Sequence, residues 1–286
     1  MYQTLIEVHE LARLLAPGST AASLAIIDCR FELGRPAAGA AAFAEAHLPG
    51  ALYADLERDL SGPVTPTSGR HPLPEPRKLA RRLGAWGIAA DVQVVAYDQG
   101  NGAFAARLWW LLRWLGAERV AVLNGGFAAW VAAGQPVTAA VLGRAPREFV
   151  PRLRAHAAVT SDEVARDLAS GAIRLVDARA ADRFAGQNET IDPVAGHVAG
   201  AVNHPFASNL DANGRFRDAA ALRERWLATL AGRTPQALVA MCGSGVTACH
   251  NLLALELAGL PGARLYAGSW SEWIRDPSRP IATGAL

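Results

Sequence analysis

Residues 237–249 read ALVAMCGSGVTAC, and the order of residue types in this segment predicts the fold of the second half of the chain. A short apolar run comes first, a loop with two glycines follows, and a helical pattern then runs from Cys249 to Leu257. A buried strand, a tight loop and a helix in this order are typical of an α/β domain with a mainly parallel sheet. The same order occurs at residues 92–104, VQVVAYDQGNGAF, where Asp98 falls opposite Cys242.

The chain repeats itself at a spacing close to half its length. Three further pairs of segments recur in the same order: LAIIDCR (24–30) and IRLVDAR (173–179), HLPGA (47–51) and HVAGA (197–201), NGGFAAW (124–130) and AGSWSEW (267–273). Ordered matches at a nearly constant spacing indicate a duplication. We therefore predict an α/β fold of two like domains, each a mainly parallel sheet flanked by helices, with residues 1–142 as the first domain, 143–158 as a linker and 159–286 as the second domain.

The composition argues against several classes of protein. The 28 basic and 26 acidic residues give a net charge of +2 and are scattered, so the chain has no basic stripe that would predict binding to nucleic acid or to a membrane surface. No apolar run approaches the roughly 20 residues of a membrane helix, and the first fifteen residues lack the basic region of a secretory signal. Three cysteines are too few for a disulfide framework, so we expect a cytoplasmic protein.

Cys242 is the candidate nucleophile. It follows a buried strand and precedes a helix N-terminus, where unpaired N–H groups and the helix dipole favour a thiolate. Gly243 and Gly245 allow backbone conformations in which successive N–H groups turn toward the sulfur. One alternative is that Cys242 is only a small buried apolar side chain. Another is a zinc site with Cys249 and His250, which lacks a fourth ligand at a familiar spacing.

These segments resemble the tandem-domain rhodaneses and 3-mercaptopyruvate sulfurtransferases over essentially the whole chain. FAEAHLPGA (43–51) is similar to the N-terminal signature of that family, and YAGSWSEW (266–273) is similar to its C-terminal signature. The loop CGSGVTA (242–248) is similar to the loop of the mercaptopyruvate branch, because the thiosulfate branch usually carries two basic residues after the cysteine. The resemblance implies that the second domain is catalytic and that the first, with Asp98 in place of the cysteine, is an inactive copy.

The resemblance also implies roles for residues around Cys242. In the mercaptopyruvate branch a Ser in the loop, a His from the first domain and an acidic residue are proposed to relay protons. The matching residues in this chain are Ser244, His71 in GRHPLP and Glu57 in ADLERD. The usual acid in the family is Asp, so Asp55 competes with Glu57 for that role.

Donor binding is assigned from the same resemblance. Arg183 in DRFAG matches the first substrate-binding Arg of the family, and we expect four loop residues to contact the donor: Gly243, Gly245, Val246 and Thr247. The second Arg of the mercaptopyruvate enzymes falls where this chain has Asp192, so either another Arg substitutes, such as Arg107 or Arg179, or the enzyme is weaker or broader for mercaptopyruvate. Thiosulfate is a dianion and 3-mercaptopyruvate carries one carboxylate, so a loop without basic residues favours the latter.

The resemblance implies a sulfurtransferase that moves sulfane sulfur from 3-mercaptopyruvate, with thiosulfate as a further donor, to a thiol or cyanide through a persulfide on Cys242. The expected partners are this small-molecule donor and a thiol acceptor such as thioredoxin or a small thiol, and no cofactor or metal is implied. A thiosulfate-preferring rhodanese and a non-catalytic sulfane-sulfur carrier or redox sensor are the alternatives. Cysteine phosphatases share the loop position but need an Arg where this chain has Ala248.

Overall fold

A computed structural model describes residues 1–16 and 24–284. The chain divides into two compact units, and each unit includes a segment from the other half of the sequence. The first unit consists of Met1–Gly62, Pro74–Arg154 and Ala212–Phe216. The second unit consists of Pro63–Leu73, Ala155–Asp211 and Arg217–Leu286.

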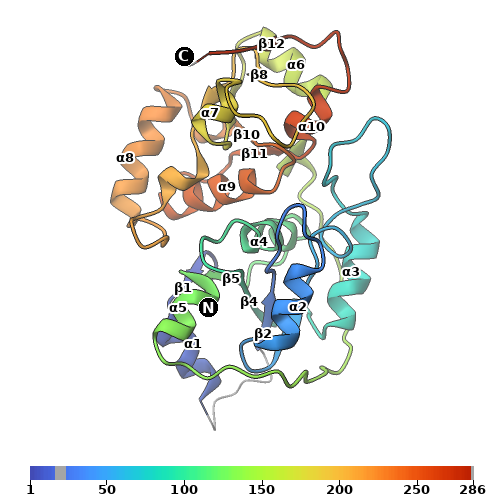
Figure 1. Cartoon of the computed structure of the whole chain (residues 1–286), viewed down its shortest axis with the longest axis vertical. Coiled ribbons are helices and arrows are strands. Elements are labelled where there is room, and N and C mark those ends of the chain that lie inside the picture. Colours follow the sequence, from blue (N-terminus) through green and yellow to red (C-terminus); the bar gives the residue numbers. More distant parts are fainter. Residues whose placement is uncertain (17–23, 285–286) are drawn as a thin grey trace. The chain divides into compact units, whose positions relative to one another are not determined.

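The first unit is built on a five-stranded parallel sheet with the order β1-β5-β4-β2-β3 (Figure 1). Its strands are β1 (Leu5–Ile6), β2 (Leu24–Asp28), β3 (Ala51–Tyr53), β4 (Gln93–Tyr97) and β5 (Val120–Leu123). Its helices are α1 (Val8–Leu15), α2 (Ala38–Glu45), α3 (Pro76–Ala85), α4 (Ala105–Trp114) and α5 (Gly126–Ala132). Side chains of α1, α2 and α5 pack with the strands in one core, whose members include Leu11, Phe43 and Trp130.

The second unit has a five-stranded parallel sheet with the order β6-β11-β10-β7-β9. Its strands are β6 (Ala158–Val159), β7 (Arg174–Asp177), β9 (Val202–Asn203), β10 (Leu238–Met241) and β11 (Arg264–Tyr266), and an antiparallel pair joins β8 (His197–Val198) to β12 (Ile281–Ala282). Its α-helices are α6 (Ser161–Ala169), α7 (Ala181–Phe184), α8 (Ala219–Leu230), α9 (Thr247–Leu257) and α10 (Ser269–Trp273). Its short 3₁₀ helices are η2 (Ala155–Ala157), η3 (Phe206–Asn209) and η4 (Pro235–Ala237).

The inner strands are continuous apolar runs because helices cover both faces of a parallel sheet. All residues of β2 (LAIID) and of β10 (LVAM) are buried. When the repeated segments are aligned, β2 matches β7 and β4 matches β10, and the two sheets then have the same strand order. The predicted α/β fold, with two parallel-sheet domains flanked by helices, is therefore confirmed.

A buried ion pair recurs at the carboxyl end of the same strand in both units. The guanidinium of Arg30 contacts the carboxylate of Asp28 at 2.6 Å, and that of Arg179 contacts Asp177 at 2.7 Å. Each Arg also donates to a main-chain oxygen that precedes a repeated His, Ala46 O in the first unit and Gly196 O in the second. Both copies of the sheet are thus braced at the edge where their loops begin.

The helices are short. The longest helix in the described parts of the chain, α8, has 12 residues, and it begins where the Asp218 carboxylate accepts the N–H of Ala221. Over residues 1–16 and 24–284, the helices lack the length and the run of apolar side chains that a membrane crossing requires.

Candidate active site

Cys242 lies directly after β10, an inner strand of the second sheet. Only 2% of the residue is exposed, and the main-chain N–H of Gly245 donates a hydrogen bond of 3.1 Å to its Sγ. Gly245 has a φ of +77°, and a Cβ at this position would lie 2.3 Å from Ala267 O. The loop can therefore present this N–H to the sulfur only with glycine at position 245. One of the amide donors predicted around the sulfur is thus in place.

The backbone of Cys242 is fixed by the repeated segment at residues 267–273. The N–H of Cys242 donates to Ser269 Oγ at 3.1 Å, and its carbonyl oxygen accepts the N–H of Trp270 at 3.0 Å. Ser269 is fully buried and has a φ of +55°, which is unusual for a residue with a side chain. Its hydroxyl in turn donates to Tyr266 O at 2.9 Å. This segment therefore sets the position of the thiol although it lies 25 or more residues away along the chain.

Helix α9 follows the loop directly. It begins at Thr247 with Val246 as its N-cap residue, two residues earlier than the helical pattern in the sequence predicts. Its eleven residues place a positive helix end next to the loop, which favours an anionic sulfur. Cys249 lies in the first turn, fully buried, with its Sγ 3.3 Å from Gly245 O. The second thiol of this region is therefore part of the core.

His71 pairs with Ser244 in the same loop. The segment Pro63–Leu73 belongs to the second unit, although it lies between β3 and α3 of the first unit in the sequence. His71 Nδ1 is 2.7 Å from Ser244 Oγ, and the two residues are 3% and 6% exposed. A buried imidazole and a hydroxyl at hydrogen-bond distance can pass a proton between them. The structure therefore brings these two predicted residues together, two positions from Cys242.

Arg70 lies beside this pair and was missed in the sequence. Its guanidinium forms an ion pair with Asp192, and its Nη2 would lie 3.0 Å from a Cβ on Gly243. Arg183, which was predicted, also lies near Gly243, with its Nη2 3.8 Å from the same Cβ position. The available signal was the motif GRHPLP itself, in which a cation directly precedes His71.

Two carboxylates neutralise these guanidinium groups. Arg183 donates to both oxygens of Glu189 at 2.8 and 2.9 Å, and it contacts Asp192 at 3.3 Å. The side chains of Glu189 and Asp192 are each 2% exposed. Burial raises the pKa of Asp192 above its usual value, although Arg70 beside it acts in the opposite direction. The position where the family has its second substrate-binding Arg is thus occupied by Asp192, an acid that contacts both Arg70 and Arg183.

Arg107 and Arg179, the two examples of a substituting Arg, are bound to other groups of the protein. Arg107 is fully buried in the first unit, where its Nη2 donates to Leu60 O. The side chain of Arg179 is 1% exposed, and its guanidinium is bound by Asp177, by Gly196 O and, at 3.4 Å, by Glu189. Neither can contact a donor without leaving buried partners.

Glu57 and Asp55 both belong to the first unit. Glu57 is exposed, and its main-chain N–H donates to Asp55 Oδ1 at 2.9 Å. The same Asp55 oxygen accepts the N–H of Arg58. Asp55 is thus used in a turn and Glu57 extends into solvent, and the role of either in a proton relay stays a prediction.

The equivalent loop of the first unit contains its own anion. The carboxylate of Asp98 accepts four main-chain N–H groups at 2.9–3.2 Å, those of Gly100, Gly102, Phe104 and Ala105. Burial raises the pKa of Asp98, and these hydrogen bonds oppose the rise. The loop after β4 therefore shows how many amides this fold can direct at one anionic side chain. The amides of this loop therefore bind the carboxylate of Asp98, and the loop has no thiol at the position that corresponds to Cys242.

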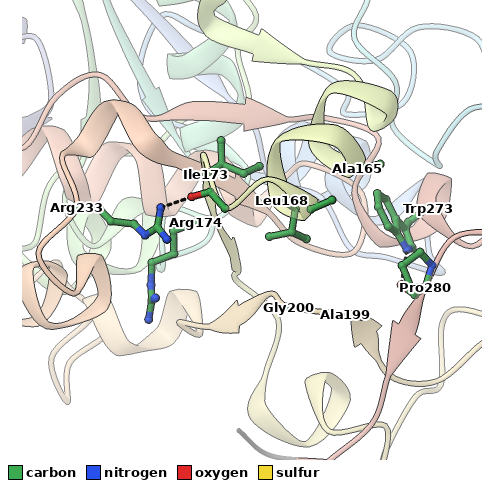
Figure 2. A pocket seen from close by; sticks show the side chains of 11 residues that line it. Ala165, Leu168, Ile173, Arg174, Ala199, Gly200, Arg233, Trp273 and Pro280 are labelled. Atoms are coloured by element: carbon green, nitrogen blue, oxygen red, sulfur yellow. Dashed lines mark hydrogen bonds between the residues drawn. The ribbon is translucent and has the colours of Figure 1, made fainter.

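A separate pocket lies near the amino end of β7 in the second unit. It has a volume of about 490 Å³ and is lined by apolar side chains such as Leu168 and Trp273 together with Arg174 and Arg233 (Figure 2). Arg174 begins β7, whereas Cys242 follows the carboxyl end of the neighbouring parallel strand. This pocket is therefore not part of the Cys242 site. Within residues 1–16 and 24–284, no three His, Cys, Asp or Glu side chains gather as ligands for a metal ion.

Comparison with known proteins shows which family the chain is similar to. The model of the rhodanese-like domain matches twice, over residues 7–133 and 160–276. The chain is 52% identical to a "Probable 3-mercaptopyruvate sulfurtransferase" of Pseudomonas aeruginosa, over 96% of this chain and 97% of that protein. It is 35% identical to thiosulfate sulfurtransferase of Rattus norvegicus, over 96% and 93% of the two chains. The crystal structure of SseA from Escherichia coli, a 3-mercaptopyruvate sulfotransferase, matches with a TM-score of 0.80 at 29% identity, over 95% and 100% of the chains.

Proposed function

Because this chain belongs to the rhodanese family, we propose that it is a sulfurtransferase that moves sulfane sulfur from 3-mercaptopyruvate to a thiol acceptor through a persulfide on Cys242. The observation that carries this proposal is the environment of one sulfur. Cys242 Sγ accepts the N–H of Gly245, and the His71–Ser244 pair lies in the same loop. The family resemblance predicted from the sequence is confirmed by the two matches to the rhodanese-like domain.

In the first half-reaction the thiolate of Cys242 attacks the sulfur of the donor. An S–S bond forms, the C–S bond of the donor breaks, and its electron pair leaves as the enolate of pyruvate. The enolate becomes pyruvate by taking up a proton, and Ser244 with His71 behind it is the pair placed to supply that proton. Amide donors such as Gly245 N–H then stabilise the negative charge of the persulfide.

In the second half-reaction an acceptor thiolate attacks the outer sulfur of the persulfide. The new S–S bond forms on the acceptor, and the electron pair of the broken bond returns to Cys242 as a thiolate. We propose thioredoxin or a small thiol as this acceptor. We also propose a cytoplasmic location, because the three cysteines are free and suit a reducing compartment.

Thiosulfate is the second donor that the proposal admits, and the rat relative carries its name. With thiosulfate the leaving group is sulfite, which departs with the electron pair of an S–S bond and needs no proton on carbon. We propose that Arg183 holds the anionic end of either donor, and the position of its Nη2 near Gly243 supports this. We expect the higher kcat/KM for 3-mercaptopyruvate, because the loop after Cys242 contains no basic residue.

Intact-mass measurement tests the proposal directly. Purified protein incubated with 3-mercaptopyruvate and no acceptor should gain the mass of one sulfur atom, and a reducing thiol should remove it. Cys242→Ser should gain nothing, whereas Cys249→Ala, which alters a buried thiol of the same region, should gain the sulfur as the unchanged chain does. Loading without any turnover would favour the sulfur-carrier alternative, and no loading from either donor would contradict the proposal.

A further inference from the structure

Arg70 is held in the second unit by its backbone. The N–H of Arg70 donates to Ser271 Oγ at 3.0 Å. A Cβ on the preceding Gly69 would lie 2.5 Å from Gly268 O, so the two backbones are in close contact. The position of Arg70 therefore does not depend on its own side chain. The contacts of the guanidinium are therefore not needed to hold the segment in place.

The guanidinium of Arg70 is only partly satisfied. Its ion pair with Asp192 uses Nη1. Its Nε is buried and has no hydrogen-bond partner in the described parts of the chain. Its Nη2 lies over Gly243, the residue after Cys242, where Arg183 Nη2 also lies. A buried N–H without an acceptor is unfavourable, and an anion over Gly243 would satisfy it.

We propose that Arg70 is the second anchor for the anionic group of the sulfur donor, and that Asp192 is a built-in counter-ion that restricts the charge of the donor. The inference rests on the proposed function and names the groups that determine its donor preference. Arg70 and Arg183 approach the same side of Gly243, one from segment Pro63–Leu73 and one from α7. Two guanidinium groups at one point form a carboxylate clamp.

Asp192 sets the charge of this clamp. It bridges Arg70 and Arg183, and Glu189 already neutralises Arg183 through both oxygens. The two cations and two carboxylates sum to zero, so an arriving donor meets N–H donors without excess positive charge. Such a site holds the single carboxylate of 3-mercaptopyruvate by hydrogen bonds, and it gives the dianion thiosulfate no extra attraction for its second charge, because repulsion from Asp192 and Glu189 offsets attraction to the two arginines. The loop after Cys242 has no basic residue and the clamp has no net charge, and both features favour 3-mercaptopyruvate over thiosulfate as the donor.

Two variants test the two halves of the inference. Arg70→Gln should raise KM for both donors about tenfold with kcat changed little, because it removes a charge-assisted hydrogen bond to the donor, and Arg70→Lys should recover only part of the loss. Asp192→Asn should raise the ratio of kcat/KM for thiosulfate to that for 3-mercaptopyruvate about tenfold, since the dianion gains one more charge interaction than the monoanion. The ratio is the readout because any loss of clamp geometry affects both donors.

Matched controls come from the first unit. Arg147 and Asp91 form an exposed ion pair at 2.9 Å, so Arg147→Gln and Asp91→Asn make the same changes of charge far along the chain from the loop. Neither should alter KM or the donor ratio. An unchanged KM in Arg70→Gln would overturn Arg70 as an anchor, and an unchanged donor ratio in Asp192→Asn would overturn Asp192 as the counter-ion.

A binding measurement separates this inference from the proposed function. Calorimetric titration with pyruvate and with sulfate requires no turnover. Arg70→Gln should weaken the binding of both anions, and Asp192→Asn should strengthen sulfate relative to pyruvate. If the wild-type protein neither loads sulfur nor turns over a donor, but the two variants show these changes in anion binding, the proposed function fails and the anion clamp stands. If turnover is found but the shifts are absent from both binding and kinetics, the clamp fails alone.

Discussion

Replacing Ser244 by Ala should slow sulfur transfer from 3-mercaptopyruvate far more than transfer from thiosulfate. The two donors differ in their leaving groups. Pyruvate leaves as an enolate whose carbon must be protonated, whereas sulfite leaves without a proton on carbon. If the His71–Ser244 pair supplies that proton, its loss affects only the first donor.

The size of the effect follows from the geometry of the pair. The variant removes the hydroxyl that lies 2.7 Å from Nδ1 of a His that is 3% exposed, so bulk water replaces it poorly. A positioned proton donor contributes about 10²–10⁴ in rate, which corresponds to about 3–5 kcal/mol of activation free energy. We therefore expect kcat with 3-mercaptopyruvate to fall at least about a hundredfold. The accompanying loss of stability is about 1–3 kcal/mol, the cost of an unmade buried hydrogen bond.

Steady-state rates with both donors and a common acceptor, cyanide, measure the effect. Thr229→Ala is the matched control, because Thr229 Oγ1 lies 2.8 Å from Nδ1 of another buried His, His204, in the same unit. This variant has a similar cost in stability and should leave the ratio of the two rates unchanged. An equal loss for both donors in Ser244→Ala, or no loss for either, would refute the role of Ser244 in protonation.

Three further predictions concern other residues. Gly245→Ala should abolish sulfur loading on Cys242 and lower stability by more than about 1–2 kcal/mol, because its φ is +77° and its Cβ would meet Ala267 O; normal loading would contradict this account. Asp98→Asn should lower the free energy of unfolding by about 1–3 kcal/mol without changing loading, and a loss of loading would show that the first unit is not an inactive copy. Burial lowers the pKa of His204 from 6.5 to about 4, so the folded state favours the neutral ring. The free energy of unfolding is therefore highest above pH 6.5, where the ring is neutral in both states. It falls as the pH decreases toward 4, because the unfolded chain takes up a proton that the folded chain does not. Chemical unfolding should show a decline steeper than in His204→Gln by at most about 1.4 kcal/mol per pH unit, and equal slopes would be the contrary result.

The fold was predictable because its signals are local. Continuous apolar runs such as those of β2 and β10 mark buried parallel strands, and their repetition in order revealed the second domain. The exchange of segments was not predictable. Residues 63–73 and 212–216 have no apolar period, and only contacts made after folding assign each to a unit.

The candidate site was predictable where one side chain sufficed to identify it. Cys242, Ser244 and His71 stand in recognisable motifs, and the structure places His71 against Ser244, two residues from Cys242, while their catalytic roles stay predictions. Arg70 was overlooked because its importance depends on where its guanidinium lies, over Gly243 and against Asp192, and a sequence does not show such a distance. The same limit applies to the four amides around Asp98, since a carboxylate in place of a thiol says nothing about its donors.

The assignment of residues 63–73 to the second unit has a practical consequence for anyone who divides the gene at its midpoint. A fragment that covers residues 159–286 would keep Cys242 but would lack both His71 and Arg70. Its thiol would have neither its imidazole nor its second guanidinium, so a half-length protein would be a poor surrogate in inhibitor screening. The second unit is thus not encoded by the second half of the sequence alone, because the first half supplies two of its side chains, His71 and Arg70.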